Sequence, residues 1–111
     1  MDHVLTVSLI GPIVEELVFR GAILRGLVKL KVPGILAIII SSMLFGLLHV
    51  ISAGDFGTIF PYIFAGLTFG FVYYLSDSII TSIIVHASMN TIAVCMLIWL
   101  QFYRTLIQGM A

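Results

Sequence analysis

The sequence predicts an all-α fold, a polytopic membrane bundle of about four transmembrane helices. Of its 111 residues, 61% are hydrophobic and 9% are charged, whereas about 25% of the residues in a soluble domain are charged. Four apolar stretches follow one another with short polar or helix-breaking connections, and none shows the alternating pattern of a membrane strand. A helix satisfies its own backbone hydrogen bonds in lipid. We therefore expect residues 1–111 to form a single helical domain surrounded by membrane lipid.

Each apolar stretch is close to the ~20 residues that a spanning helix needs. In chain order, the four helices are expected from about Val4 to Val28, from Ile35 to Ile51, from Thr58 to Leu75, and from just after Ser78 to Leu100. Pro33 and Gly34 suit a helix start, and Gly54 suits a helix end. Pro61 suits the first turn of the third helix.

Two further patterns concern packing within the bundle. Gly66 and Gly70 form a G-x-x-x-G pattern on the third helix, which favours close contact between helices. Cys95, the only cysteine, excludes an internal disulfide and is interpreted as a packing residue. Aromatic residues near the helix ends are expected at the membrane interface, without a catalytic role: Tyr62, Tyr73, Tyr74, Trp99 and Tyr103.

Charge predicts the orientation and excludes one class of partner. The formal net charge is zero and there is no basic run, so no nucleic acid is expected as a partner. Arg25, Lys29 and Lys31 place the first connection on the cytoplasmic side by the positive-inside rule. The N-terminus, the connection at Asp55 and the C-terminus are then outside, although Arg104 opposes this orientation. The first residues lack the positive charge of a signal peptide, so the first apolar stretch is expected in the mature protein.

Polar residues inside these apolar stretches are the main pointer to function. Ionisable groups at membrane depth cost roughly 2.5 kcal/mol or more each and are rarely there for structural reasons alone. Together with one amide, they are Glu15, Glu16, Arg20, His49, His86 and Asn90. Counted from the end of the bundle with the first connection, Glu15, His49, His86 and Asn90 lie ~21, ~24, ~14 and ~20 Å deep, from the helical rise per residue. Three helices are therefore expected to bring polar groups to one level.

The charges of the first helix divide into a pair and a free carboxylate. Residues four apart share a helix face, so Glu16 and Arg20 are expected to form a buried ion pair. Glu15 points about 100° away from Glu16 and is the better candidate for a carboxylate that acts as a base. In the alternative interpretation, all three charges form a structural clamp between helices.

His86 and Asn90 are four residues apart on the fourth helix, which aims an imidazole and an amide at one point. Two neutral donors that converge in a dry site suit a developing oxyanion. His49, alone in an apolar run, is either a packing residue or a partner of the carboxylate. A carboxylate base, a histidine and convergent donors together match general-base hydrolysis of an amide.

These motifs resemble those of the type II CAAX prenyl endopeptidase and bacteriocin-processing family of intramembrane proteases, often called CPBP or Abi. The family pattern is E-E-x-x-x-R, then F-x-x-x-H, then H-x-x-x-N. The chain carries Glu15-Glu16-x-x-x-Arg20, Phe45-x-x-x-His49 and His86-x-x-x-Asn90, in this order and on separate expected helices. The resemblance extends from about Ile10 to the middle of the fourth helix.

The resemblance implies a glutamate-dependent intramembrane endopeptidase. Glu15, helped by His49, would activate a water. His86 and Asn90 would stabilise the oxyanion, with Glu16 and Arg20 in support. The substrate would be a membrane-anchored or hydrophobic peptide, such as a CAAX-type C-terminus or a peptide leader, at a bacterial plasma membrane. Family members usually have helices before this core, so additional helices or a homo-oligomer would complete the wall that holds the substrate.

A metal is the main mechanistic alternative. Glu15, His49 and His86 could form a three-ligand zinc set with an open position for water. However, no H-E-x-x-H pattern occurs, and Asn90 stands where the second histidine of an H-x-x-x-H pair would be. Catalysis without a cofactor is therefore favoured. A serine mechanism is disfavoured because Ser88 and His86 lie on different helix faces and no G-x-S-x-G pattern exists.

Two other functional classes fit the same polar residues. A transporter subunit would also place charges in membrane helices, but the sequence shows neither inverted repeats nor broken helices. A catalytically inert membrane scaffold or an immunity-type binding protein could keep the same clamp of charges. A scaffold would tolerate Glu15→Gln, whereas a peptidase would lose turnover.

Overall fold

The structure, a computed structural model, describes residues 2–110. These residues are almost entirely helical and contain no strand, so the predicted all-α class is confirmed. Within this range, four helices follow one another, joined at residues 30–33, 54–58 and 77–78. The described part of the chain thus has the number of helices expected from its apolar stretches.

The first helix runs from residue 2 to residue 29 and alternates between α and π hydrogen-bond registers. Its segments are α1 (Asp2–Leu5), η1 (Thr6–Ile10), α2 (Gly11–Glu16), η2 (Leu17–Leu24) and α3 (Arg25–Lys29), of which η1 and η2 are π-helical. The backbone stays right-handed and helical across the junctions, for example at Glu16 with φ −69° and ψ −37°. π-Helical turns are rare and are frequent at functional sites. Here the two π segments lie on either side of Glu15 and Glu16.

Pro12 explains why a backbone carbonyl of η1 can bind a side chain of the last helix. The backbone N–H of Gly11 donates to the Thr6 carbonyl, five residues back. The next donor in this register would belong to residue 12, but proline has no N–H. The Val7 carbonyl instead accepts a hydrogen bond from Asn90 Nδ2 at 3.0 Å. The first helix is thereby tied to the last helix.

The other helices begin close to the expected positions. They are α4 (Gly34–Ala53), the 3₁₀ turn η3 (Phe56–Thr58), α5 (Ile59–Ser76) and α6 (Ile79–Met110). Pro33 precedes α4 with ψ 140°, outside the helical region. Gly54 ends α4 in the left-handed region at φ 70°, where glycine has no steric cost. Pro61 lies in the first turn of α5, as predicted.

The expected end of the last helix at Leu100 is wrong, because α6 continues to Met110. The residues after position 100 are more polar but contain no proline, so nothing interrupts the backbone hydrogen bonds of the helix. With 32 residues, α6 is about 48 Å long at the helical rise per residue. It is therefore longer than the ~30 Å hydrocarbon core of a bilayer.

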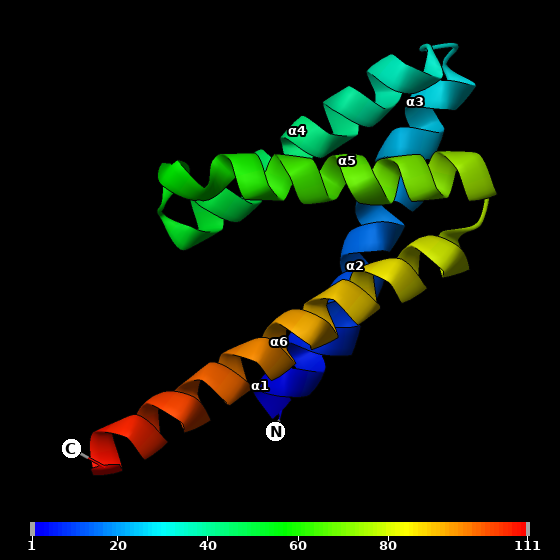
Figure 1. The fold of residues 1–111 in the computed structure, drawn as a ribbon. Helices are drawn as coiled ribbons and strands as arrows, with labels where there is room; N and C mark the ends of the chain where they lie inside the picture. The colour runs from blue at the N-terminus through cyan, green and yellow to red at the C-terminus, as the bar shows by residue number, and fades with distance from the viewer. Residues whose placement is uncertain (1, 111) are drawn as a thin grey trace.

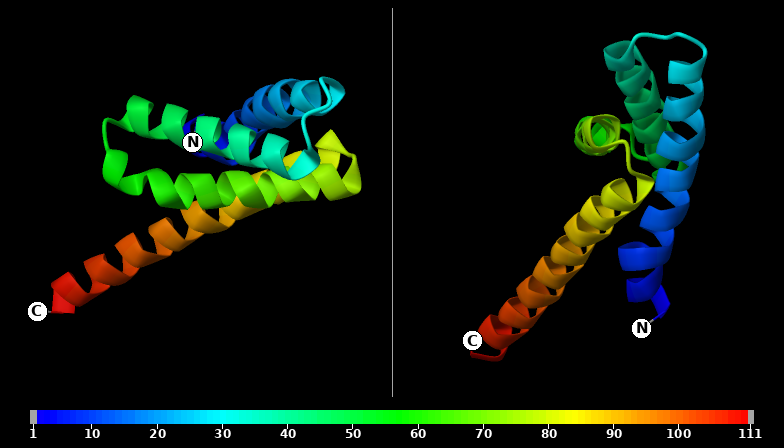
Figure 2. Two further views of the ribbon diagram at one scale, coloured as in Figure 1. Left: turned by 90° about the horizontal axis from the view of Figure 1, so that it is seen from above. Right: turned by 90° about the vertical axis from the view of Figure 1, so that its right-hand side faces the viewer.

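The helices form a bundle that is closed at one end and open at the other. Figure 1 shows α4 and α5 side by side, with the first helix passing behind them. Figure 2 shows that α6 leaves the bundle, so that its C-terminal half and the N-terminal half of the first helix diverge. On α6, every described side chain beyond Val94 is exposed. The described molecule measures 61 × 28 × 21 Å along its principal axes.

Glycines let α4 and α5 approach each other closely. A Cβ atom on Gly66 would lie 3.0 Å from the Ser42 Cα atom, and one on Gly70 would lie 3.0 Å from a methyl carbon of Ile38. Both distances are shorter than an ordinary contact between carbon atoms. The G-x-x-x-G pattern is thus confirmed as a packing face, and it sets the position of α5 against α4.

The buried apolar residues form two small clusters. One consists of Leu24, Ala37, Ile38 and Tyr73, and the other consists of Phe19, Phe45 and Phe69. Tyr73 is 9% exposed, so it packs into the protein and does not face the membrane interface as expected. Phe45 and Phe69 of the second cluster also line the pocket described below.

Three helical segments are long and apolar enough to cross a membrane: Gly34–Ala53, Phe56–Ser76 and Ile79–Met110. The first helix, divided between α and π segments, also exposes apolar side chains, among them Val14, Leu17 and Val18. Apolar side chains therefore cover the outside of the bundle. This is the surface expected of helices in contact with lipid.

Candidate active site

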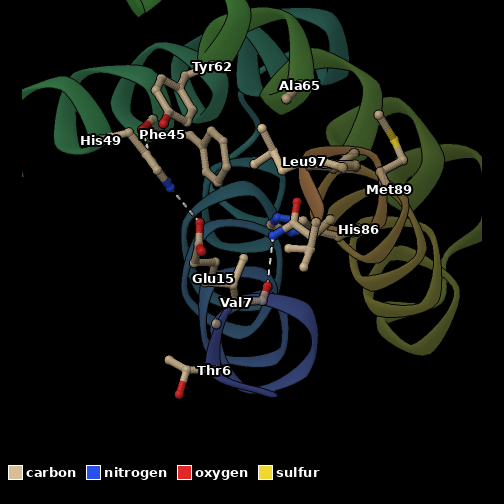
Figure 3. Close-up of a pocket in the computed structure, with 15 residues that line it drawn as sticks. Thr6, Val7, Glu15, Phe45, His49, Tyr62, Ala65, His86, Met89 and Leu97 are labelled. Atoms are coloured by element: carbon tan, nitrogen blue, oxygen red, sulfur yellow. Dashed lines mark hydrogen bonds and ion pairs between the residues drawn. The ribbon is translucent and has the colours of Figure 1, made fainter. Parts of the chain in front are cut away.

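A pocket of 610 Å³ lies where the four helices meet (Figure 3). Glu15 enters it from the first helix, His49 from α4, and His86 and Asn90 from α6. The prediction that these four residues meet at one level is thus confirmed. The pocket is also lined by Thr6, Val7, Gly11, Phe45, Tyr62, Ala65, Phe69, Met89, Ala93, Val94 and Leu97.

The Glu15 carboxylate and the His49 imidazole are in direct contact in this pocket (Figure 3). Glu15 Oε2 lies 2.8 Å from His49 Nε2, and Nδ1 of the same ring lies 2.7 Å from the Phe45 carbonyl oxygen. A carbonyl oxygen only accepts, so Nδ1 carries a proton and Nε2 meets the carboxylate. Nε2 and Oε2 are therefore the atoms through which the imidazole and the carboxylate make their ion-pair contact. Glu15 and His49 are 25% and 26% exposed, so the pair is open to the pocket.

The neighbouring carboxylate, Glu16, is fully buried and accepts hydrogen bonds from three side chains. Arg20 Nη1 lies 3.1 Å from Glu16 Oε2, which confirms the ion pair predicted from their spacing. His86 Nδ1 lies 2.8 Å from the same oxygen, and the Ser82 hydroxyl donates to Oε1. A buried carboxylate is tolerated when it is paired and hydrogen-bonded in this way. Glu16 therefore holds its partners in place, whereas Glu15 is open to the pocket.

Arg20 connects the first helix to α5. Its Nη2 donates to the Gly66 carbonyl oxygen at 2.6 Å. The guanidinium carbon lies 5.0 Å from the ring centroid of Phe45 and 5.5 Å from that of Phe69. The positive charge is thus balanced by a carboxylate, a carbonyl and two aromatic rings, although the side chain is fully buried.

His86 and Asn90 both line the pocket. They were expected to aim at one point, but each forms a hydrogen bond with a different residue of the first helix. His86 Nδ1 donates to Glu16, which leaves Nε2 for the pocket. One N–H of the Asn90 amide donates to Val7, and the amide has a second N–H. Asn90 therefore retains a donor for a substrate, whereas His86 can donate from Nε2 only when its ring carries a second proton. The i, i+4 spacing could not indicate these partners, because both come from the first helix.

Three residues of the site lie outside the sequence motifs. Tyr62, expected at the membrane interface without a role, lines the pocket with its ring stacked on His49. Phe69 is stacked on His86. Ser82 precedes His86 by four residues, and this spacing was a signal that it shares the same helix face.

The zinc alternative requires Glu15, His49 and His86 to converge on one ion. Among the side chains that the structure describes, no three from His, Cys, Asp and Glu lie close enough together to hold a metal. Glu15 Oε2 and His49 Nε2 are 2.8 Å apart, whereas two ligand atoms of a tetrahedral zinc ion are about 3.3 Å apart at the usual zinc–ligand distances. The donor set therefore does not fit zinc in this arrangement.

Comparison with known proteins identifies the family. The family model for type II CAAX prenyl endopeptidase Rce1-like proteins matches residues 3–92. The chain belongs to this family. The matched range contains all six polar residues of the motifs and ends within α6, before the half of that helix that leaves the bundle. Family membership and the apolar helices together make this a membrane protein of an endopeptidase family.

Three bacterial relatives resemble most of the chain. It is 37% identical over 89 residues to "Putative membrane peptidase YdiL" of Bacillus subtilis. The aligned residues make up 80% of this chain and 34% of that protein. It is 40% identical over 90 residues to a Mycoplasma capricolum protein, covering 80% and 25% of the two chains. It is 36% identical over 83 residues to "UPF0177 protein YxdF" of Lactococcus lactis, covering 75% and 43%. The chain thus spans less than half of each of these relatives. No solved structure matches it.

Proposed function

We propose that this protein is an intramembrane endopeptidase in which Glu15 activates a water to hydrolyse a peptide bond. The observation that carries the proposal is the 2.8 Å contact between Glu15 Oε2 and His49 Nε2 in a pocket of 610 Å³. Membership in an endopeptidase family supports the same activity. A carboxylate in contact with an imidazole is suited to general acid–base catalysis.

In the proposed reaction, Glu15 takes a proton from a bound water while the water oxygen attacks the carbonyl carbon of the scissile bond. A new C–O bond forms, and the electrons of the carbonyl π bond move to the oxygen, which becomes an oxyanion. When the oxyanion collapses, the C–N bond breaks and Glu15 passes the proton to the leaving nitrogen. His49 keeps the Glu15 carboxylate in position, because its ring is itself held by the Phe45 carbonyl.

We assign oxyanion stabilisation to Asn90 and His86. Asn90 would donate from the amide N–H that does not bind Val7, and His86 would donate from Nε2 in its doubly protonated form. Preorganised donors act on charge that develops in the transition state and are typically worth about 10²–10³-fold each in kcat. In this proposal, side chains supply all of the chemistry and no cofactor is required.

The proposed substrate is a hydrophobic or lipid-anchored peptide, such as the prenylated CAAX C-terminus in the family's description or a peptide leader. Apart from Tyr62, His86 and Asn90, the residues that α5 and α6 contribute to the pocket are apolar, with Ala65, Met89 and Leu97 among them. A wall of such residues suits apolar groups, because no polar group of the protein loses a partner when they bind. The relatives are bacterial, which supports a bacterial plasma membrane as the location. Their greater length supports additional helices, or a second copy, around the pocket.

Glu15→Gln and His49→Ala test the proposal. Each is expected to lower kcat by about 10²–10⁴-fold, because each removes part of a positioned base. The measurement is cleavage of an internally quenched, farnesylated CAAX peptide by the purified protein in liposomes. Asp77→Asn is the matched control, since it is also an acid-to-amide change but lies exposed between α5 and α6, and it should retain turnover.

Full turnover in folded Glu15→Gln would contradict the proposal. It would favour the inert scaffold or immunity-type protein, in which the buried charges only join helices. If the parent protein leaves the farnesylated peptide intact, comparing the C-termini of cellular proteins with and without this protein will show whether another membrane peptide is cut. A parent that changes no peptide terminus would overturn the assignment as a peptidase.

A further inference from the structure

Helix α5 carries no charged residue of the site, but two of its aromatic rings contact the two histidines. The ring centroids of Tyr62 and His49 are 4.7 Å apart, and their planes differ by 26°. The centroids of Phe69 and His86 are 4.1 Å apart, and their planes differ by 18°. Tyr62 and Phe69 are seven residues apart, about two helical turns, so they lie on the same face of α5. One face of one helix therefore stacks on both imidazoles.

Phe45 completes the aromatic surroundings of these histidines. Its ring centroid lies 4.2 Å from that of His49 at an interplanar angle of 41°, so His49 packs against both Phe45 and Tyr62. Phe45 also approaches His86 in an edge-on arrangement, with centroids 5.9 Å apart at 69°. Phe45 belongs to the F-x-x-x-H motif, whereas Tyr62 and Phe69 belong to no motif of the chain.

A hydrogen bond to Nδ1 restrains the rotation of an imidazole about its Cβ–Cγ bond but leaves the ring some freedom to tilt, because hydrogen bonds tolerate a range of angles. His49 Nδ1 is held by the Phe45 carbonyl and His86 Nδ1 by the Glu16 carboxylate. Within the range of angles that this hydrogen bond tolerates, each ring could still tilt and shift Nε2 relative to the pocket. An aromatic ring stacked on the imidazole removes this freedom, because an offset-stacked pair prefers one relative orientation of its planes.

We propose that Tyr62 and Phe69 are positioning residues that set the planes of His49 and His86, so that both Nε2 atoms face the reacting groups. The link from these planes to turnover rests on the proposed peptidase function. Stacking also places an aromatic face against any imidazole that becomes charged during the reaction, and such a face attracts a cation. α5 thus contributes to the chemistry through the orientation of two rings, without contributing a proton donor or acceptor.

Histidine ring protons measure this stacking directly. The chain contains three histidines, so the protein labelled with ¹³C-histidine should give three Hε1 signals, and protons above an aromatic face are shifted upfield. In Tyr62→Leu, the His49 signal should move downfield while that of His86 stays in place. In Phe69→Leu, the reverse is expected. In each variant the unaffected histidine reports that the fold is intact, and Phe64→Leu, a 74% exposed position on α5, should move neither.

Turnover of the farnesylated peptide then tests the consequence. Tyr62→Leu should lower kcat by about 10- to 100-fold with little change in KM, because small misplacements of reacting groups cost rate more than binding. Tyr62→Phe, which keeps the ring, should retain the upfield His49 signal and recover most of the loss. A purely structural role predicts lower stability of Tyr62→Leu without this split between kcat and KM.

Two results would overturn the inference. The first is an unchanged His49 signal in Tyr62→Leu together with an unchanged His86 signal in Phe69→Leu. The second is Tyr62→Phe as impaired as Tyr62→Leu, which would make the hydroxyl the important group. Failure of the parent protein to cleave any peptide would instead count against the proposed function, and the histidine signals would still decide whether the rings are stacked.

Discussion

Both oxygens of the Glu16 carboxylate accept hydrogen bonds, although this side chain is completely buried. Burial of an ion is costly in a low-dielectric interior, and removal of one partner leaves the other uncompensated. Arg20 donates to Glu16 from Nη1 and to the Gly66 carbonyl from Nη2. Glu15, one residue away, contacts the His49 imidazole and is 25% exposed. Two adjacent residues of one type therefore have different surroundings, which separates a supporting carboxylate from a candidate base.

Arg20→Leu should destabilise the protein by about 3–5 kcal/mol, because it leaves the Glu16 charge buried without its cation. The double change Glu16→Gln with Arg20→Leu should recover part of this loss. Thermal unfolding in detergent measures both effects, with Arg104→Leu, an exposed arginine on α6, as the control. An unchanged unfolding temperature for Arg20→Leu would show that the pair does not stabilise the fold.

Asn90→Ala should lower kcat by about 10²–10³-fold with little change in KM, because an oxyanion donor acts mainly on transition-state charge. It should also lower stability by about 1 kcal/mol, the usual net contribution of one hydrogen bond, since the Val7 carbonyl loses its donor. Thr91→Ala is the control, because this exposed neighbour binds only the Ala87 carbonyl of its own helix. A higher KM at unchanged kcat would assign Asn90 to substrate binding.

Chelation of metal ions should leave the activity of the parent protein unchanged. The 2.8 Å contact between Glu15 and His49 leaves too little space for a shared zinc ion. Steady-state turnover with and without a chelator, together with elemental analysis of the purified protein, measures this. About one zinc ion per chain, lost in parallel with activity, would overturn the metal-free mechanism and leave the peptidase assignment intact.

At the scale of the elements, backbone geometry determines where the site residues lie. Pro12 leaves the Val7 carbonyl free for Asn90, which joins the first helix to α6. Close packing at Gly66 brings α5 against α4, and with it the carbonyl that binds Arg20 and the rings that stack on the histidines. The arrangement of the candidate catalytic groups thus depends on residues that take no part in the proposed reaction.

Gly66→Ala should destabilise the bundle by about 1–3 kcal/mol, the usual cost of overpacking. The new Cβ would lie 3.0 Å from the Ser42 Cα and 3.3 Å from Phe45 Cδ1, and backbone atoms cannot move aside as a flexible side chain can. Gly26→Ala is the matched control, because nothing lies within 4 Å of its Cβ position and alanine favours a helix. Thermal unfolding should rank the parent between the two variants, and a loss in Gly26→Ala as large as that in Gly66→Ala would contradict the packing argument.

At the scale of the whole molecule, the C-terminal half of α6 diverges from the N-terminal half of the first helix (Figure 2), and both helices contribute residues to the pocket. The family match ends at residue 92, and the exposed half of α6 lies beyond it. The relatives are at least twice as long as the part that they share with this chain. That additional helices or a second copy of the chain complete the wall of the pocket stays a prediction.

The orientation in the membrane can be tested with single cysteines in a Cys95→Ser background. Leu30→Cys and Asp55→Cys place a thiol in the first and second connections, at exposed positions. By the positive-inside rule, a membrane-impermeant maleimide should label Asp55→Cys in intact cells, and Leu30→Cys only after permeabilisation. The Cys95→Ser parent should stay unlabelled, and the reverse pattern of labelling would invert the predicted topology.

The sequence by itself determined the features that depend on local hydropathy and spacing. The apolar stretches predicted the all-α membrane fold, and Pro33 and Gly54 marked the limits of α4. The four-residue spacing predicted the Glu16–Arg20 ion pair. The helical rise per residue predicted that Glu15 and the polar residues of α4 and α6 meet at one depth.

Only the tertiary structure decided which side chain contacts which. His86 binds Glu16 across 70 positions of the sequence, and Asn90 binds Val7 across 83. Tertiary packing also determines that Tyr62 contacts His49. It likewise determines the direction in which α6 leaves the bundle. Spacing along a helix gives depth and relative direction within that helix. The rotation of each helix and the angles at which helices cross depend on how complete surfaces pack together, and no local pattern contains that information.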